Sequence, residues 1–113
     1  MKNTIIIIAL MILIAACAKQ PAASETKADV KADVTVTIKE FKFAPETVTV
    51  KQGQTVKWVN EDGAVHTVEA NNKAFASPEL YQGDAWAFTF DKKGAYEYIC
   101  GIHPTMKGKV VVE

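Results

Sequence analysis

The residues best suited to hold a metal ion are rare in this chain, and three of them fall within seven positions. The sequence has two histidines, two cysteines and three methionines, and Cys100, His103 and Met106 share the stretch 100–106. The other histidine is His66. A thiolate, two imidazoles and a thioether make a trigonal site with a weak axial ligand, which is typical of electron-transfer copper. We therefore predict that these four residues are metal ligands.

Two other interpretations of the same residues remain open. Two imidazoles and a thiolate also suit Zn²⁺, with a water molecule or Met106 nearby. Each residue alone has a structural explanation, since a lone cysteine is usually a small buried hydrophobe and a lone methionine usually fills a core. An adhesion-type sandwich with four incidental residues would require all of these rare types to gather by accident.

The N-terminal third of the chain predicts export. The positively charged start, 1–3, is followed by the apolar run 4–16, which is shorter than the roughly 20 residues that span a bilayer. The run ends in Ile-Ala-Ala before Cys17, like a bacterial lipobox. We therefore expect residues 1–16 to be a lipoprotein-type signal peptide. Cys17 would then be the lipidated N-terminus, unless an ordinary signal peptide is cleaved a few residues later.

Residues 17–33 are expected to form a flexible tether behind the lipidated Cys17. This stretch is rich in Ala, Lys, Asp and Glu and has no aromatic residue, so it cannot bury enough apolar surface to fold. The folded domain is then 34–113. With Cys17 assigned to lipid, Cys100 is the one thiol left, and an unpaired cysteine in an exported protein requires an explanation.

The pattern of apolar residues in 34–113 predicts an all-β domain. Apolar and polar residues alternate with period two around 34–38, 48–50, 56–58, 86–90, 96–100 and 110–112, which is typical of strands with one buried face. Turn residues separate these runs, and six or more short strands favour a sandwich or a barrel. One helical turn is the alternative to strand around 74–81, where Pro78 disfavours a long helix.

The sequence resembles the cupredoxins, the small blue-copper proteins, most strongly in 94–100, in the ligand loop that runs on to Met106 and in 107–113. The spacing Cys-x-x-His-x-x-Met with Pro104 after the histidine is closest to the group of amicyanin, plastocyanin and pseudoazurin. The resemblance covers about 34–113 and implies a Greek-key β-sandwich with one type 1 copper ion. It implies that His66 is the upstream imidazole ligand, Cys100 the thiolate, His103 a second and more exposed imidazole, and Met106 the axial thioether.

One position departs from the family pattern. Many cupredoxins have Asn directly after the upstream histidine, where it ties the two ligand loops together, and this chain has Thr67. We expect the Thr67 hydroxyl to substitute for that amide in part, with an effect on the reduction potential.

The resemblance implies a carrier of single electrons that cycles between Cu(II) and Cu(I), and the lipobox-like run before Cys17 leads us to expect that this carrier is anchored to a membrane. The alternative is a module that stores or delivers copper without a redox partner. An enzyme is not expected, because a copper nitrite reductase or oxidase needs further ligands and no spare histidine remains. The expected protein partner is a redox protein such as a c-type cytochrome or a dehydrogenase, and the lipid anchor is expected to bind the membrane. We expect a monomer, located on the periplasmic or cell-surface side.

The surface around His103 is the expected docking face for such a partner. A small apolar patch is predicted there, made of Ala64, Val65, Ile102 and Pro104. Charged residues on the same loops are expected to be solvated loop charges, with the orientation of a docking partner as the alternative: Glu61, Asp62, Lys107 and Lys109. Thirteen lysines, no arginine and thirteen acidic residues give no reason to expect nucleic-acid binding.

Overall fold

The computed structural model describes residues 31–113. Its eight strands are β1 (Val34–Lys39), β2 (Lys42–Ala44), β3 (Thr47–Val50), β4 (Thr55–Asn60), β5 (Glu69–Ala70), β6 (Ala85–Thr89), β7 (Gly94–Ile99) and β8 (Lys107–Val112). The predicted signal peptide, Cys17 and nearly all of the predicted tether lie outside the described residues. Between residues 31 and 113, no helix has the length and apolar character needed to cross a membrane.

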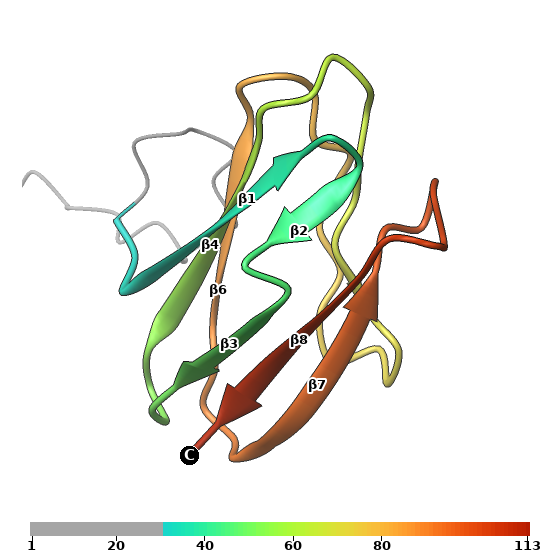
Figure 1. Cartoon of the computed structure of the whole chain (residues 1–113). Coiled ribbons are helices and arrows are strands. Elements are labelled where there is room, and N and C mark those ends of the chain that lie inside the picture. The colour runs from blue at the N-terminus through green and yellow to red at the C-terminus, as the bar shows by residue number, and fades with distance from the viewer. Residues whose placement is uncertain (1–30) are drawn as a thin grey trace, which may run out of the picture.

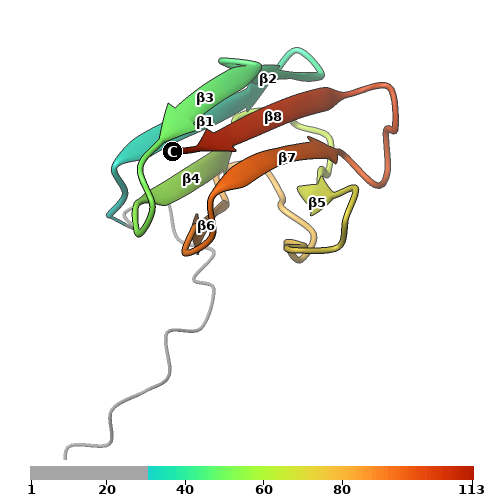
Figure 2. The ribbon, with the colours of Figure 1, turned by 90° about the horizontal axis from the view of Figure 1, so that it is seen from below.

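The strands form two four-stranded sheets, with strand orders β2-β1-β4-β6 and β3-β8-β7-β5 (Figure 1). Figure 2 shows β3, β8 and β7 as one layer, with β1 and β4 in the layer behind it. One pair in each sheet is parallel, β1 with β4 and β3 with β8, and the other pairs are antiparallel. The predicted all-β sandwich is confirmed.

Alternating side chains from both sheets meet in one core between the layers. In β4 the burial alternates at every residue, with Val56 and Trp58 fully buried. In β7 the exposed Glu97 lies between the partly buried Tyr96 and the buried Tyr98. The indole of Trp58 packs edge-on against the Tyr98 ring, with centroids 5.5 Å apart, so the two sheets are joined through aromatic contact.

The segment between β5 and β6 differs from the sequence-based expectation. No helical turn forms within 74–81, so that expectation was wrong. Instead Phe75 and Leu80 are buried, and isolated bridges pair Ala76 with Glu69 and Leu80 with His66. The two apolar side chains join the core from an extended chain, which satisfies its backbone groups by pairing with its neighbours.

Strand register brings the two predicted ligand loops to the same end of the sandwich. The short strand β5 pairs with β7 so that Glu69 lies opposite Ile99. His66 lies three residues before Glu69, and Cys100 follows Ile99 directly. The pairing of β5 with β7 therefore places His66 beside Cys100, although 33 residues separate them.

Candidate metal centre

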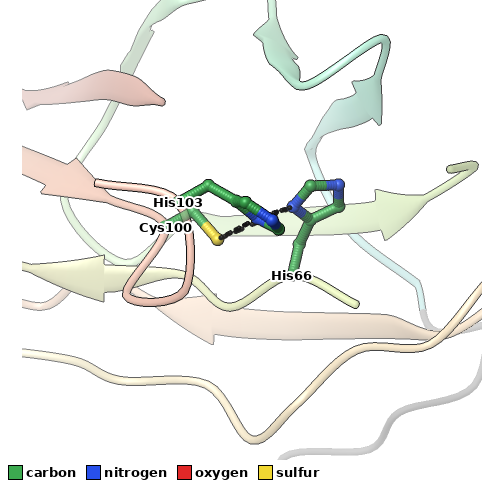
Figure 3. A group of neighbouring side chains, drawn as sticks. All are labelled: His66, Cys100 and His103. Atoms are coloured by element: carbon green, nitrogen blue, oxygen red, sulfur yellow. Dashed lines mark hydrogen bonds between the residues drawn. The ribbon is translucent and has the colours of Figure 1, made fainter. Parts of the chain in front are cut away.

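Three of the four predicted ligands direct potential ligand atoms toward one point (Figure 3). His66 Nδ1 lies 3.6 Å from Cys100 Sγ, His103 Nδ1 lies 3.7 Å from the same sulfur, and the two nitrogens are 3.2 Å apart. Among residues 31–113, these three form the one group of His, Cys, Asp and Glu side chains with the spacing of a metal site. The point equidistant from the three atoms lies about 2.0 Å from each, which is a normal metal–nitrogen distance.

Backbone pairing and a buried amide hold His66 in place. Its N–H donates to the Leu80 carbonyl at 3.0 Å, and its carbonyl accepts from the Leu80 N–H at 2.7 Å. The fully buried Asn60 side chain donates to the carbonyls of Ala64 and Leu80, at 2.9 and 2.8 Å. Asn60 thus connects the loop that carries His66 to the segment that carries Leu80.

Asp62 orients the His66 ring, contrary to the expectation that it is a solvated loop charge. Its Oδ2 lies 2.9 Å from His66 Nε2, and its side chain is 12% exposed. Nε2–H donates to the carboxylate, so the lone pair of Nδ1 faces Cys100 and His103. Desolvation raises the pKa of Asp62, but N–H donors from Phe41, Glu40 and His66 together hold it below its ordinary value.

Thr67 makes three hydrogen bonds, and two of them tie the two ligand loops together. Its N–H donates to the Cys100 sulfur at 3.4 Å, a bond that favours the thiolate. Its hydroxyl accepts from the Gly101 N–H at 2.8 Å and donates to Glu69 Oε2 at 2.7 Å. The expectation that the Thr67 hydroxyl links the two loops is therefore confirmed, with Glu69 as a partner that the sequence did not reveal.

The Glu69 carboxylate also lies against the residue after Cys100. A Cβ on Gly101 would collide with this carboxylate, so a larger residue at this position would displace Glu69 from its hydrogen bond with Thr67.

The loop from Cys100 to Met106 is closed by its own backbone. The Cys100 N–H donates to the Met106 carbonyl at 3.1 Å, and the Met106 N–H donates to the His103 carbonyl at 2.9 Å. Cys100 is fully buried and Met106 is 4% exposed, whereas His103 is partly exposed. His103 is therefore the more exposed of the two imidazoles, as the resemblance implies.

The predicted docking patch reaches solvent around His103. Ile102 is 46% exposed, Pro104 is exposed, and Ala64 and Val65 are partly exposed. Phe41, which the sequence did not point to, is 51% exposed. Its ring lies edge-on to both imidazoles.

The ligand set fits one type 1 copper ion. Two imidazole nitrogens and a buried sulfur form the corners of a small triangle. Met106, which carries the thioether, closes the loop that begins at Cys100. Thiolate and thioether suit Cu(I), and imidazole suits both oxidation states. The triangle alone would also admit Zn²⁺, because zinc too is bound by imidazole nitrogen and thiolate sulfur.

Comparison with known proteins defines the class. The profile of the cupredoxin-like domain matches residues 5–112. The chain is 42% identical to amicyanin of Paracoccus versutus over 93 residues, which is 76% of this chain and 70% of that protein. It is 33% identical to plastocyanin of Scenedesmus fuscus over 84 residues, 63% of this chain and 86% of that protein.

Solved structures agree with the sequence comparison. The reduced Cu(I) form of an amicyanin variant superimposes with a TM-score of 0.72 at 33% identity, covering 80% of this chain and 92% of that one. The chain belongs to the cupredoxin family, and the predicted cupredoxin-like Greek-key sandwich is confirmed.

Proposed function

We propose that this protein carries single electrons on one copper ion held by His66, Cys100, His103 and Met106. This proposal rests on the triangle formed by His66 Nδ1, Cys100 Sγ and His103 Nδ1, with sides of 3.2 to 3.7 Å. A bound copper ion would supply the redox couple Cu(II)/Cu(I). Met106 would be the fourth and weaker ligand, by its place in the loop and its family position.

The surroundings of the triangle favour a carrier over a store. His66 is fixed by Leu80 and Asp62, and Cys100 is fixed by Thr67 and Met106. Ligands held by bonds that do not involve the metal rearrange little when the charge of the metal changes, so electron transfer meets a small barrier. A store that hands over its ion benefits instead from ligands that open readily.

We further propose that electrons pass through the edge of His103. His66 and Cys100 are fully buried, whereas His103 is partly exposed and neighbours the exposed Ile102 and Pro104. A small apolar surface suits a weak, short-lived encounter with a redox protein such as a c-type cytochrome or a dehydrogenase. In this proposal the protein is an exported monomer, tethered by residues 17–33 to a membrane through lipidated Cys17.

The test begins with Cu(II) added to the domain 34–113. Thiolate-to-copper charge transfer should give an intense blue colour, and Cys100→Ser should abolish it. A matched control is Thr105→Ser, at an exposed position of the same loop, which should remain blue. A colourless wild-type domain would contradict the copper proposal and favour zinc or no metal.

A second step separates carrier from store. Fast reduction and reoxidation of the blue protein by a c-type cytochrome, without loss of copper, supports the carrier. Slow electron exchange with rapid transfer of copper to an acceptor protein would support storage or delivery. Lipidation is tested by labelling with a radioactive fatty acid, which Cys17→Ser should prevent.

A further inference from the structure

The turn between β1 and β2 has an unfavourable backbone conformation. Lys39 pairs with Lys42, so Glu40 and Phe41 are the two residues of a tight hairpin turn. Both have positive φ, 54° and 56°. Turns of this kind favour Asn-Gly, because positive φ is costly for residues with a side chain. Glu40 and Phe41 both lack the conformational freedom of glycine, so contacts from outside the turn must stabilise it.

Asp62 provides that stabilisation, and it also holds a proposed copper ligand. Its Oδ1 accepts from the Glu40 N–H at 2.7 Å, and its Oδ2 accepts from the Phe41 N–H at 3.0 Å. The same Oδ2 lies 2.9 Å from His66 Nε2. One carboxylate therefore connects the turn to the His66 ring, although Asp62 lies at least 21 positions after the turn in the sequence.

The turn places the Phe41 ring over both imidazoles. Its centroid is 5.2 Å from that of His66 and 5.0 Å from that of His103, with interplanar angles of 84° and 89°. These are favourable edge-to-face arrangements. Phe41 remains 51% exposed as a residue, so burial in the core does not explain the position of its ring. The contact with the two histidines does.

We propose that Phe41 is a positioning residue that covers the imidazole pair and retards the departure of copper, with Asp62 anchoring the turn. The proposal rests on the proposed ligand set. His66 is fully buried and paired on both sides of its backbone with Leu80, so His103 is the imidazole with room to leave. To leave the metal, the His103 ring must give up its contact with Phe41 or push that ring aside.

Two glycine variants isolate the ring from the turn. Glycine adopts positive φ freely but loses more freedom on folding, and these effects offset each other. Both Phe41→Gly and Glu40→Gly should therefore fold, and both retain the N–H groups that bind Asp62. Only Phe41→Gly removes the ring, so Glu40→Gly is the matched control.

The measured quantity is the rate at which the Cu(I) protein gives up its metal to excess bathocuproine disulfonate. Aromatic contacts of this kind with two partners are together worth on the order of tenfold. Phe41→Gly should release copper on the order of tenfold faster than wild type, and Glu40→Gly should match wild type within about twofold. Equal rates for all three proteins, or equal acceleration in both variants, would overturn the proposal.

A second readout does not depend on copper. In the metal-free protein, nuclear Overhauser contacts should join the Phe41 ring protons to those of both histidines, and Glu40→Gly should keep them. If these contacts were absent in wild type, the proposed position of the Phe41 ring over the two imidazoles would be wrong, even if copper binds. If wild type bound no copper but showed these contacts, the ligand set would fail while the position of Phe41 would stand.

Discussion

Replacing Thr67 by valine tests whether its hydroxyl joins the ligand loops. Valine keeps the branched shape and the backbone N–H that bonds to Cys100, and removes the bonds to Gly101 and Glu69. Hydrogen bonds to charged groups contribute about 1.5–3 kcal/mol and neutral ones about 1 kcal/mol. Because Gly101 is exposed and Glu69 is partly exposed, water replaces part of this loss, and we expect a cost of about 2 kcal/mol.

Urea unfolding of the copper-free domain measures this cost. With a slope of about 1–2 kcal/mol per molar urea, the midpoint should fall by about 1–2 M. Thr49→Val, at an exposed position of β3, is the control and should change it little. In a double-mutant cycle with Glu69→Ala, the coupling should be about 1 kcal/mol. Additivity within about 0.5 kcal/mol would refute the link between Thr67 and Glu69.

Three further predictions concern other buried contacts. Gly108→Ala should cost about 2–3 kcal/mol in urea unfolding, because the new Cβ would overlap the buried ring of Tyr98. Burial raises the pKa of Tyr98 to about 12, partly offset by the Trp58 indole, and neither polar group has a hydrogen-bond partner of good geometry. Because this pKa lies above the value of about 10 in the unfolded chain, the folded state keeps its full stability below about pH 10 and loses stability as the pH rises through about 12. Tyr98→Phe should therefore weaken this loss of stability at alkaline pH. Asp62→Asn should cost about 1–3 kcal/mol, because an amide cannot accept all three N–H groups; nitrogen chemical shifts of His66 should show a changed tautomer balance, and unchanged shifts would contradict its role.

Much of the fold was predictable because alternation reports which side chains face the core. Six of the eight strands contain the alternating runs, including Val56-Lys57-Trp58 in β4. The strands β2 and β5 were missed because they have three and two residues, too few for a period to be visible. The parallel pairing of β1 with β4 was also not predictable, since alternation reports the face of a strand and not its neighbour.

The proposed ligands were predictable because their residue types are rare, and their supporting residues were not. Asp62 looks like any loop carboxylate until the fold brings Phe41 and His66 to it. Glu69 lies in a two-residue strand that only its pairing with β7 reveals. Phe41 lies in a turn whose positive φ values are unexpected for Glu-Phe. Each role depends on contacts between distant segments, which a single sequence does not specify.

X-ray absorption at the copper edge tests the central claim most directly, because it reports the ligand atoms in both oxidation states. We expect two nitrogens and one sulfur in oxidised and in reduced protein, with closely similar distances, since His66, Cys100 and His103 already converge on one point. Cys100→Ser should remove the contribution of the thiolate sulfur. A spectrum of wild type without sulfur, or a ligand set that changes on reduction, would contradict an electron carrier built on these residues.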